Sequence, residues 1–534
     1  MNIPDLPVNP GLGSMFAKAG FATLLTLLSC RAVDYLALSG AMKRGLTHPL
    51  DSKGWWLGEL AWLGLLGLFE LVTGTWLFST VCVVVLMGAL AIASRVKEGV
   101  LREPLEFTDF ILITNIIKHP AFYLDAVPRP LFGAAFLVII GLVGFIIWQS
   151  TTALTPRFVG ACEMVVGFGI LWGCLRHTTI MGRNDFTRHT PPQVVTAHVQ
   201  RHGMLATLLG HSLRWMEPRP ASTPDPLNLS LGQEALPDLL LIVQGESWAE
   251  PDQIFTGLPQ TPVPLPALNR IRSEPSTWWG DLVPSGFGAY TMRTEHGVLF
   301  GLADSQLAHR AFDPYMTAAE DIACALPNRL ARYYRQRLFI HPHDLRFYNR
   351  DHLMPKAGFN GLVGPKAFQG AKSCGPYVSD KALGLDIMRR LEGYNPAAGR
   401  LYIHAVTMEN HGPWQAGRAG AATALDAWLM HVRHSDDLLG ELDQALEAQA
   451  LRGHSGMLVF FGDHRPAFKE CAPGRSPATR TTPWLIKRYP PSNDAHPDQT
   501  VSKQNVTLTP AALHKVILEA LLRTTTARAS EAAQ

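Results

Sequence analysis

The sequence LVFFGDHRP, from Leu458 to Pro466, decides the fold of this chain. Its four apolar residues, Leu458 to Phe461, predict a buried strand that ends at Gly462. Asp463 and His464 follow directly, and a carboxylate oxygen and an imidazole nitrogen are both common metal ligands. Because ligands bind beyond the carboxyl ends of strands in open α/β sheets, the pair predicts a metal site at such an edge. An ordinary exposed Asp-His pair is the competing interpretation.

Polar side chains also follow three other predicted strands. The carboxyl ends of parallel strands meet at one edge of a sheet, so parallel pairing would bring all of these side chains together. Helices are expected at Thr317–Gln336, Asp380–Glu392 and Ala422–Ala448, and the alternation predicts an α/β sheet with helices on both faces. The strands and the residues after them are Leu239–Val243 with Glu246 and Ser247, Arg337–Ile340 with His341, His343 and Asp344, Leu401–Val406 with Glu409, Asn410 and His411, and Met457–Phe461 with Asp463 and His464.

A candidate nucleophile lies in SGFGAYTMRTEHGVLFGL, from Ser285 to Leu302. Gly286 and Gly288 predict a flexible loop, and an apolar helical stretch begins near Thr291. A hydroxyl at a helix N-terminus lies at the positive end of the helix dipole, which favours phosphate. If Thr291 also binds the metal, its hydroxyl loses its proton more easily and attacks as an alkoxide. A simple N-cap role for Thr291 is the alternative.

The composition excludes some classes of protein. The chain has 534 residues, too many for one ordinary core, and a formal net charge of only +3, so no polybasic nucleic-acid surface is indicated. Apolar residues concentrate in the first third, and the remainder has the composition of a soluble domain. The seven cysteines show no Cys-x-x-Cys pair, and a disulfide from Cys324 to Cys374 is an option if the soluble part is exported.

The first 180 residues predict about five membrane crossings, at roughly 20 residues each. Five crossings place the two ends of the chain on opposite sides of the membrane. The loop from Arg95 to Arg129 is basic, which favours a position on the cytoplasmic side. Five crossings with an exported C-terminal domain would instead place this loop outside. The topology of the loop therefore stays open. The expected segments are about Phe16–Leu38, two helices within residues 55–94 separated at Thr73-Gly74-Thr75, Leu131–Trp148 and Phe158–Leu175.

The remaining sequence divides into three parts. Residues 181–235 predict a linker, residues 236–523 a soluble α/β domain and residues 524–534 a disordered tail. Within the linker, apolar residues at helical spacing indicate a helix that lies either in the membrane interface or on the soluble domain. These residues are Val195, Val199, Leu205, Leu208, Leu209, Leu213 and Trp215.

Six motifs in order resemble the lipoteichoic acid synthase and membrane phosphoglycerol transferase group of the alkaline phosphatase/sulfatase superfamily. The resemblance covers most of the chain and implies about five transmembrane helices, residues 1–180, followed by an extracytoplasmic sulfatase-like catalytic domain, residues 236–523. The motifs are LREPLEFTDF (Leu101–Phe110), LIVQGES ending at Ser247, TMRTEHGVL with Thr291 and Glu295, HPHDLRFYNRD (His341–Asp351), TMENHGPW (Thr407–Trp414) and FGDHRP ending at Pro466.

The resemblance also implies roles for individual residues. Glu246, Thr291, Asp463 and His464 would hold one divalent ion. The ion would be Mn²⁺, as in the family, with Mg²⁺ and Zn²⁺ as alternatives. Thr291 would also be the nucleophile. The phosphoglycerol head group would be bound by His341, Tyr348, Arg350 and His411. The planar guanidinium of Arg350 matches phosphate oxygens. The family position at Tyr348 is often Trp.

The implied reaction is a two-step displacement. Thr291 attacks the phosphodiester of a phospholipid such as phosphatidylglycerol, diacylglycerol leaves, and an acceptor hydroxyl then displaces the phospho-threonine ester. The implied location is a bacterial cytoplasmic (inner) membrane, with the catalytic domain on the periplasmic or extracellular side. The acceptor would be a glycan or polymer, and an Ala-, Arg-, Pro- and His-rich composition favours a Gram-negative source and hence a periplasmic glycan.

Three other functions are alternatives to this one. Phosphoethanolamine transferases share the fold and the Thr nucleophile, but usually carry more disulfides than three soluble cysteines allow. CAPGR, Cys471 to Arg475, matches the Cys-x-Pro-x-Arg pattern of sulfatases, yet it follows the last metal pair instead of the first metal strand. A non-catalytic membrane scaffold would lack Thr291 or Asp463, and both are present.

Overall fold

The computed structural model describes residues 10–37, 54–110, 154–187, 191–224, 236–254, 264–286, 288–468, 480–491 and 504–531, with a few single positions between them. The chain divides into two compact units, Met1–Pro218 and Arg219–Gln534. The boundary at Pro218 falls inside the segment predicted as a linker.

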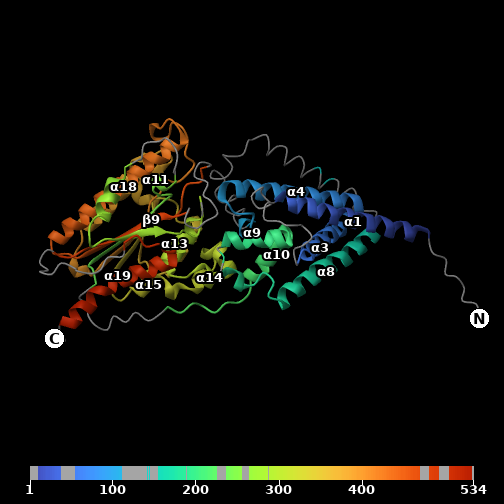
Figure 1. Cartoon of the computed structure of the whole chain (residues 1–534), viewed down its shortest axis with the longest axis horizontal. Coiled ribbons are helices and arrows are strands. Elements are labelled where there is room, and N and C mark those ends of the chain that lie inside the picture. Colours follow the sequence, from blue (N-terminus) through green and yellow to red (C-terminus); the bar gives the residue numbers. More distant parts are fainter. Residues whose placement is uncertain are drawn as a thin grey trace, which may run out of the picture. The chain divides into compact units, whose positions relative to one another are not determined.

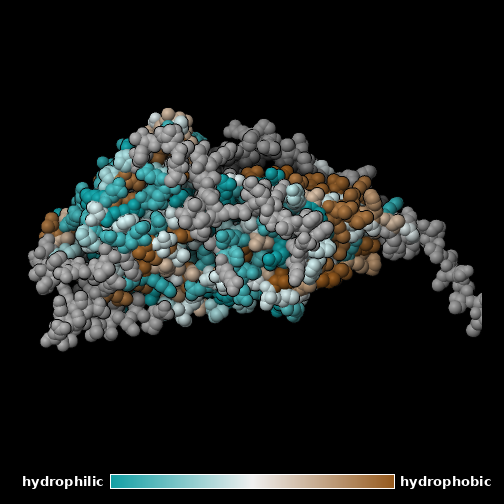
Figure 2. All heavy atoms as spheres, in the orientation of Figure 1, coloured by the Kyte–Doolittle hydropathy of each residue, from teal (hydrophilic) through white to brown (hydrophobic). Residues whose placement is uncertain are grey.

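Long apolar helices form the first unit. Four of them contain stretches long and apolar enough to cross a membrane, and large apolar side chains on their outer faces are exposed (Figure 2). The predicted break between two helices is confirmed, because Gly74 adopts φ 71° between them. The fifth predicted segment, Leu131–Trp148, lies outside the described residues. The helices are α1 (Pro10–Ala37), α3 (Trp56–Thr73), α4 (Trp76–Leu101) and α8 (Leu154–His177) (Figure 1).

The close contact between α3 and α8 depends on glycine. A Cβ atom on Gly167 would lie 2.4 Å from the backbone N of Gly64, and one on Gly67 would lie 2.3 Å from the backbone N of Met164. Both distances are far below van der Waals contact, so larger residues would push the helices apart. Small residues at a helix interface are a common means of association in membranes, where backbones must approach closely to gain packing energy.

The predicted helix of the linker is two helices, α9 (Pro191–His202) and α10 (Met204–Trp215). The break falls at Gly203, where φ is 81° and a Cβ atom would lie 2.3 Å from Oδ2 of Asp34. The apolar side of α10 packs within the first unit, against α3 and α8, where Ala206 meets Leu171 and its neighbours. A short 3-10 helix, η1 (Arg183–Thr187), precedes both.

A seven-stranded sheet forms the centre of the second unit. The four predicted strands are confirmed and lie side by side in parallel, as the clustering of their polar ends requires. Three further strands, β2, β9 and β4, were not predicted, and β9 pairs antiparallel with both β2 and β8. The strand order is β2 (Trp278–Leu282), β9 (Thr482–Tyr489), β8 (Gly456–Gly462), β1 (Leu239–Gly245), β7 (Leu401–Val406), β3 (Gln336–Ile340) and β4 (Gly361–Val363), with a separate hairpin of β5 (Ser373–Cys374) and β6 (Tyr377–Val378).

Helices cover both faces of the sheet, as predicted. Figure 1 shows α18 (Ala424–Leu451) on one side and α13 (Thr291–Phe300) with α19 (Pro510–Glu531) on the other. Alternate residues of β1 point to the α18 side, where Leu241 joins a core with α12 (Pro266–Arg272), α17 (Asp380–Glu392) and α18. This arrangement leaves the carboxyl ends of the parallel strands open as a site.

Three expectations for this unit are wrong in detail. The segment Thr317–Gln336 is not one helix, because Pro327 interrupts it and β3 begins at Gln336. The final helix α19 continues to Glu531, into the expected disordered tail. The disulfide that was an option between Cys324 and Cys374 is not formed. The short elements are α11 (Pro251–Ile254), α14 (Asp304–Leu307), η3 (Ala308–Phe312), η4 (Pro314–Met316), η5 (Ala318–Glu320), η6 (Ile322–Cys324), α15 (Leu326–Arg329), η7 (Phe347–Asn349), α16 (Arg350–Lys356), η8 (Pro365–Phe368), η9 (Pro396–Ala398) and η10 (Arg418–Gly420).

The glycine contact predicts the effect of two matched substitutions on α8. Gly167→Leu should destabilise the first unit by about 1–3 kcal/mol, because the added side chain overpacks the contact with α3. Gly169→Leu is the control, since a Cβ atom there meets nothing within 4 Å. The measurement is the midpoint of thermal aggregation of the detergent-solubilised chain. Equal losses in the two variants would contradict the packing argument.

Candidate functional site

The site begins where β1 and β8 end. These neighbouring strands pair in parallel with Gly245 opposite Gly462, so Glu246 and Asp463 leave the sheet side by side. A Cβ atom on Gly462 would lie 1.9 Å from the carbonyl oxygen of Trp248. Only glycine at this position therefore allows the end of β8 and the turn after β1 to approach this closely. The sheet register therefore places both acids at one point.

Glu246, Asp463 and His464 form a buried group with the chemistry of a metal site. Each residue contributes a ligand atom, and these atoms all lie within 4.8 Å of one another. Oδ1 of Asp463 accepts hydrogen bonds from the backbone N–H groups of Ser247 and His464, both at 2.8 Å. Oδ2 of Asp463 is buried and has no hydrogen-bond partner among the described residues, and Nε2 of His464 lies 3.5 Å from it. Two carboxylates and an imidazole around an unsatisfied buried oxygen fit a divalent cation.

Thr291 faces the same group from the first turn of α13. Its Oγ1 lies 3.4 Å from Oε2 of Glu246 and 3.4 Å from Nε2 of His464. The N-cap of α13 is Tyr290, which adopts φ 67° and makes no side-chain cap, so the N-cap role considered for Thr291 is wrong. The structure thus brings together the four residues that the resemblance implied as metal ligands.

The charges of this group are strongly coupled. Burial raises the pKa of Asp463 to about 7, and the charge of Glu246 acts in the same direction. Burial also opposes ionisation of Glu246, but the hydrogen bond and charge of His464 outweigh it and lower the pKa of Glu246 to about 2. Burial opposes protonation of His464, but Asp463 and Glu246 outweigh it and raise its pKa to about 9. Without a cation, the protonated imidazole therefore compensates the charge of the carboxylates.

A second group surrounds Arg350, implied above as a phosphate ligand. Its Nε and Nη2 donate to the two carboxylate oxygens of Glu295 at 3.0 and 2.5 Å, and the Tyr315 hydroxyl donates to the same carboxylate at 2.5 Å. Glu295 stands four residues after Thr291 on α13, so it lies on the same face of that helix. Arg350 is 2% exposed and lies 5.2 Å from the ring centroid of Tyr348. Glu295 therefore fixes the guanidinium close to α13.

Aromatic rings connect His341 with His411. The centroid distances are 6.0 Å from His341 to His343, 6.3 Å from His343 to Tyr377 and 5.4 Å from Tyr377 to His411. Nδ1 of His341 donates to the carbonyl oxygen of Val406 at 3.2 Å, and burial together with Arg350 holds its pKa well below the usual range. His341 is therefore neutral at pH 7.

Tyr377 is a site residue that the sequence analysis missed. Its hydroxyl donates to the Gly412 carbonyl at 2.9 Å and lies 3.2 Å from Nδ1 of His411, which itself donates to the Gly412 carbonyl at 2.7 Å. The residue sits in the short β5–β6 hairpin, and no motif marks it. Tyr377 thus helps to fix the His411 ring.

Two residues expected at the sheet edge have other roles. Asn410 donates from Nδ2 to the Ser247 carbonyl at 3.2 Å, so it braces the backbone after Glu246. Glu409 contacts His431 and His434 and does not belong to the group around Asp463. Cys471, from the sulfatase-like pattern, lies outside the described residues.

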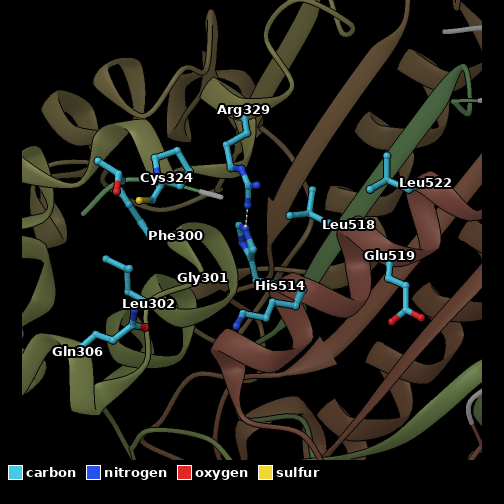
Figure 3. A pocket seen from close by; sticks show the side chains of 13 residues that line it. Phe300, Gly301, Leu302, Gln306, Cys324, Arg329, His514, Leu518, Glu519 and Leu522 are labelled. Carbon is cyan, nitrogen blue, oxygen red and sulfur yellow. Dashed lines mark hydrogen bonds between the residues drawn. The ribbon is translucent and has the colours of Figure 1, made fainter. Parts of the chain in front are cut away.

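A separate cavity lies at the other end of α13 (Figure 3). Its volume is about 450 Å³, and its lining includes Gly301, Cys324 and Arg329. His514 projects into it, accepts from Nη1 of Arg329 at 3.1 Å and donates to the Val298 carbonyl at 2.8 Å. The helix has 10 residues, about 15 Å in length, so this cavity is distinct from the Thr291 site.

Comparisons with known proteins agree with the fold. The sulfatase family model matches residues 239–514, more than half of the chain. A capsular polysaccharide biosynthesis protein of Rhizobium meliloti is 30% identical over 398 residues, which cover 71% of this chain and 71% of the relative. A putative cyclic β-1,2-glucan modification protein of the same organism is 25% identical over 422 residues, covering 70% of this chain and 61% of the relative.

One solved structure is similar over both units. Lipooligosaccharide phosphoethanolamine transferase A, an integral membrane protein of Neisseria meningitidis, aligns with a TM-score of 0.55 and 11% identity. The alignment covers 94% of this chain and 95% of that protein. At this identity the match shows a shared fold, with N-terminal membrane helices followed by an α/β domain, as the sequence analysis predicted.

The protonation of His464 predicts how cation binding depends on pH. A cation binds only the neutral imidazole, so below a pKa of about 9 it must displace a proton. We expect the affinity for Mn²⁺ to rise about tenfold per pH unit between pH 7 and 9 and then to level off. Isothermal titration in buffers of different ionisation enthalpy would count the released protons. An affinity independent of pH in this range would contradict the assignment.

The buried pair of Glu295 and Arg350 predicts a large stability effect. Glu295→Gln should destabilise the second unit by about 3–5 kcal/mol, because it leaves the buried guanidinium without a counter-charge. The double variant Glu295→Gln with Arg350→Met should lose less. Urea unfolding followed by tryptophan fluorescence measures both. As a control, Glu320→Gln at a partly exposed ion pair with Arg310 should cost less than about 1 kcal/mol.

Proposed function

Because the chain belongs to the sulfatase family of the alkaline phosphatase/sulfatase superfamily, we propose that it is a membrane-bound phosphoglycerol transferase. It moves glycerophosphate from a phospholipid such as phosphatidylglycerol to an extracytoplasmic glycan or polymer. The observation that carries this proposal is the hydroxyl of Thr291, which faces Glu246 and His464 from the N-terminus of a helix. A helix N-terminus favours the phosphate group that such a hydroxyl would attack.

Glu246, Thr291, Asp463 and His464 would hold one divalent ion. Mn²⁺ is the proposed ion, since three oxygen ligands and one imidazole suit a fairly hard cation, and Mg²⁺ and Zn²⁺ are the alternatives. When bound, the ion supplies positive charge that favours the ionised hydroxyl and neutralises the transferring phosphoryl group. The unsatisfied Oδ2 of Asp463 supports this assignment.

The protein side chains provide position and orientation for two displacements. In the first, Oγ1 of Thr291 forms a bond to phosphorus while the bond from phosphorus to the diacylglycerol oxygen breaks. The hydroxyl proton leaves Thr291, and the departing oxygen takes up a proton. In the second, an acceptor hydroxyl attacks phosphorus and releases Thr291, with the opposite proton transfers. Arg350, His341, Tyr348 and His411 bind the glycerophosphate group through both steps.

Two further observations support this donor and acceptor. The first unit has four helices suited to a membrane, which would keep the second unit near a lipid donor. The two curated relatives are named for capsular polysaccharide biosynthesis and for glucan modification, which favours a surface or periplasmic glycan as the acceptor. We place the protein in the cytoplasmic (inner) membrane of a Gram-negative bacterium, with the catalytic unit on the periplasmic side.

Phosphoethanolamine transfer is the second candidate. The chain shares its fold with a phosphoethanolamine transferase over 94% of its length, and this similarity favours the second candidate. The two candidates have the same nucleophile and differ in the head group that remains on Thr291. A sulfatase reaction is less well supported, because Thr291 occupies the position that the modified cysteine has in sulfatases.

The mass of the reaction intermediate tests the proposal. We expect the full chain, in detergent with Mn²⁺ and phosphatidylglycerol, to gain one glycerophosphate that peptide mass spectrometry locates on Thr291. Thr291→Ala should show no adduct and lose at least about 10³-fold in diacylglycerol release, because the nucleophile is removed. Thr291→Ser, which retains a hydroxyl, is the matched control.

Each alternative gives a different result in the same experiment. An adduct formed only from phosphatidylethanolamine would show that the chain transfers phosphoethanolamine and not phosphoglycerol. Diacylglycerol release that persists in Thr291→Ala would exclude the phospho-threonine mechanism. No adduct and no release with either lipid would overturn both candidate donors.

A further inference from the structure

A second group of metal-binding side chains lies outside the site described above. It consists of Cys374, Glu409, His431 and His434, whose ligand atoms all lie within 4.8 Å of one another. The four residues come from three elements: the β5–β6 hairpin, the loop after β7, and α18. No role has been assigned to them in the proposed reaction.

The geometry of this group converges on one oxygen. Nδ1 of His431 lies 2.8 Å and Nδ1 of His434 lies 2.5 Å from the same atom, Oε1 of Glu409. The two histidines are three residues apart on α18, so they share one face of that helix. The other oxygen of Glu409 accepts from the backbone N of Asp380 at 2.6 Å, which fixes the carboxylate. The four ligand side chains are therefore held by three elements, and the first residue of α17 fixes the carboxylate from a fourth.

A buried carboxylate oxygen beside the group indicates that it holds a further partner. Oδ1 of Asp380 is buried and has no hydrogen-bond partner among the described residues. His431 is 0% and Glu409 is 1% exposed. Two adjacent buried carboxylates, Glu409 and Asp380, are costly unless positive charge lies next to them. A bound cation would supply that positive charge. The imidazole nitrogens and the thiol of the group lie close enough to bind the same cation.

The ligand types select the cation. One thiolate, two imidazoles and one carboxylate make the four-ligand, nitrogen- and sulfur-rich set that Zn²⁺ prefers. The group around Asp463 offers mostly oxygen and no sulfur. We propose that Cys374, Glu409, His431 and His434 bind a second metal ion, a Zn²⁺ that is separate from the ion at the Thr291 site.

Such an ion would have a structural effect on the wall of the proposed substrate site. It would connect the β5–β6 hairpin to α18 and to the loop after β7. Tyr377 stands three residues after Cys374, and its hydroxyl bonds to Gly412 and contacts His411. The ion would therefore keep Tyr377 and His411 in position. It is a positioning element, and its existence does not depend on which head group is transferred.

Cobalt spectroscopy tests the site without measuring activity. The full chain in detergent is freed of metal with a chelator and titrated with Co²⁺. A thiolate bound to Co²⁺ gives a charge-transfer absorption band in the near ultraviolet, and the described residues of the Thr291 site include no cysteine to produce one. We expect the band in the wild-type chain, its loss in Cys374→Ser and its weakening in His434→Ala. Cys324→Ser, at the other described thiol of this unit, is the control and should keep the band.

Metal content gives an independent measurement. We expect two metal ions per wild-type chain, one of which is lost in Cys374→Ser and the other in Asp463→Asn. Absence of the band in the folded wild-type chain, or a band that survives Cys374→Ser, would overturn the proposal and leave a hydrogen-bonded Glu-His-His network. The wild-type spectrum alone shows whether the band exists, so the proposal can be tested even if a variant does not fold.

Discussion

The parallel pairing of β1 with β8 is the constraint on which the site depends. Its register sets Gly245 opposite Gly462, and the backbone N–H of Ser247 then donates to Asp463 at 2.8 Å. Ser247 adopts φ 48°, a conformation that costs free energy in a residue with a side chain. The carbonyl of the same residue accepts from Asn410 and from Trp428 on α18. Three neighbouring elements thus hold one strained turn, and this turn places Glu246 against His464.

Much of this arrangement could be predicted because it is local in sequence. Buried parallel strands are short runs of apolar residues with polar residues directly after them, so β1, β3, β7 and β8 were predicted with small errors at their ends. Strands β2 and β9 were not predicted because their apolar patterns are interrupted. β2 contains Gly280 and Asp281, and β9 contains Pro483 and the pair Lys487-Arg488. The prediction of one helix over 317–336 was wrong because it followed the helical periodicity and gave too little weight to a proline within the segment.

Contacts between distant segments could not be predicted in the same way. Glu246, Asp463, His464 and Thr291 could be singled out from three strand or helix ends, but only a resemblance to known motifs grouped them as ligands of one ion. Tyr377 and Cys374 belong to a two-residue-strand hairpin with no periodic signal, so only the fold places them beside His411 and Glu409. A weak signal did exist for the second cluster, because His431 and His434 are spaced as two ligands on one helix face.

The pairing of Arg350 with Glu295 also bears on how the proposed anionic head group would be recognised. Because Glu295 cancels the charge of the guanidinium, this wall exerts little long-range attraction on anions. Binding then depends on the direction of N–H groups over a few ångströms, and such short contacts in a buried place are only weakly screened by salt. Selectivity at this wall would come from shape and hydrogen-bond direction, so it should be largely insensitive to ionic strength, unlike a site that collects anions through net positive charge.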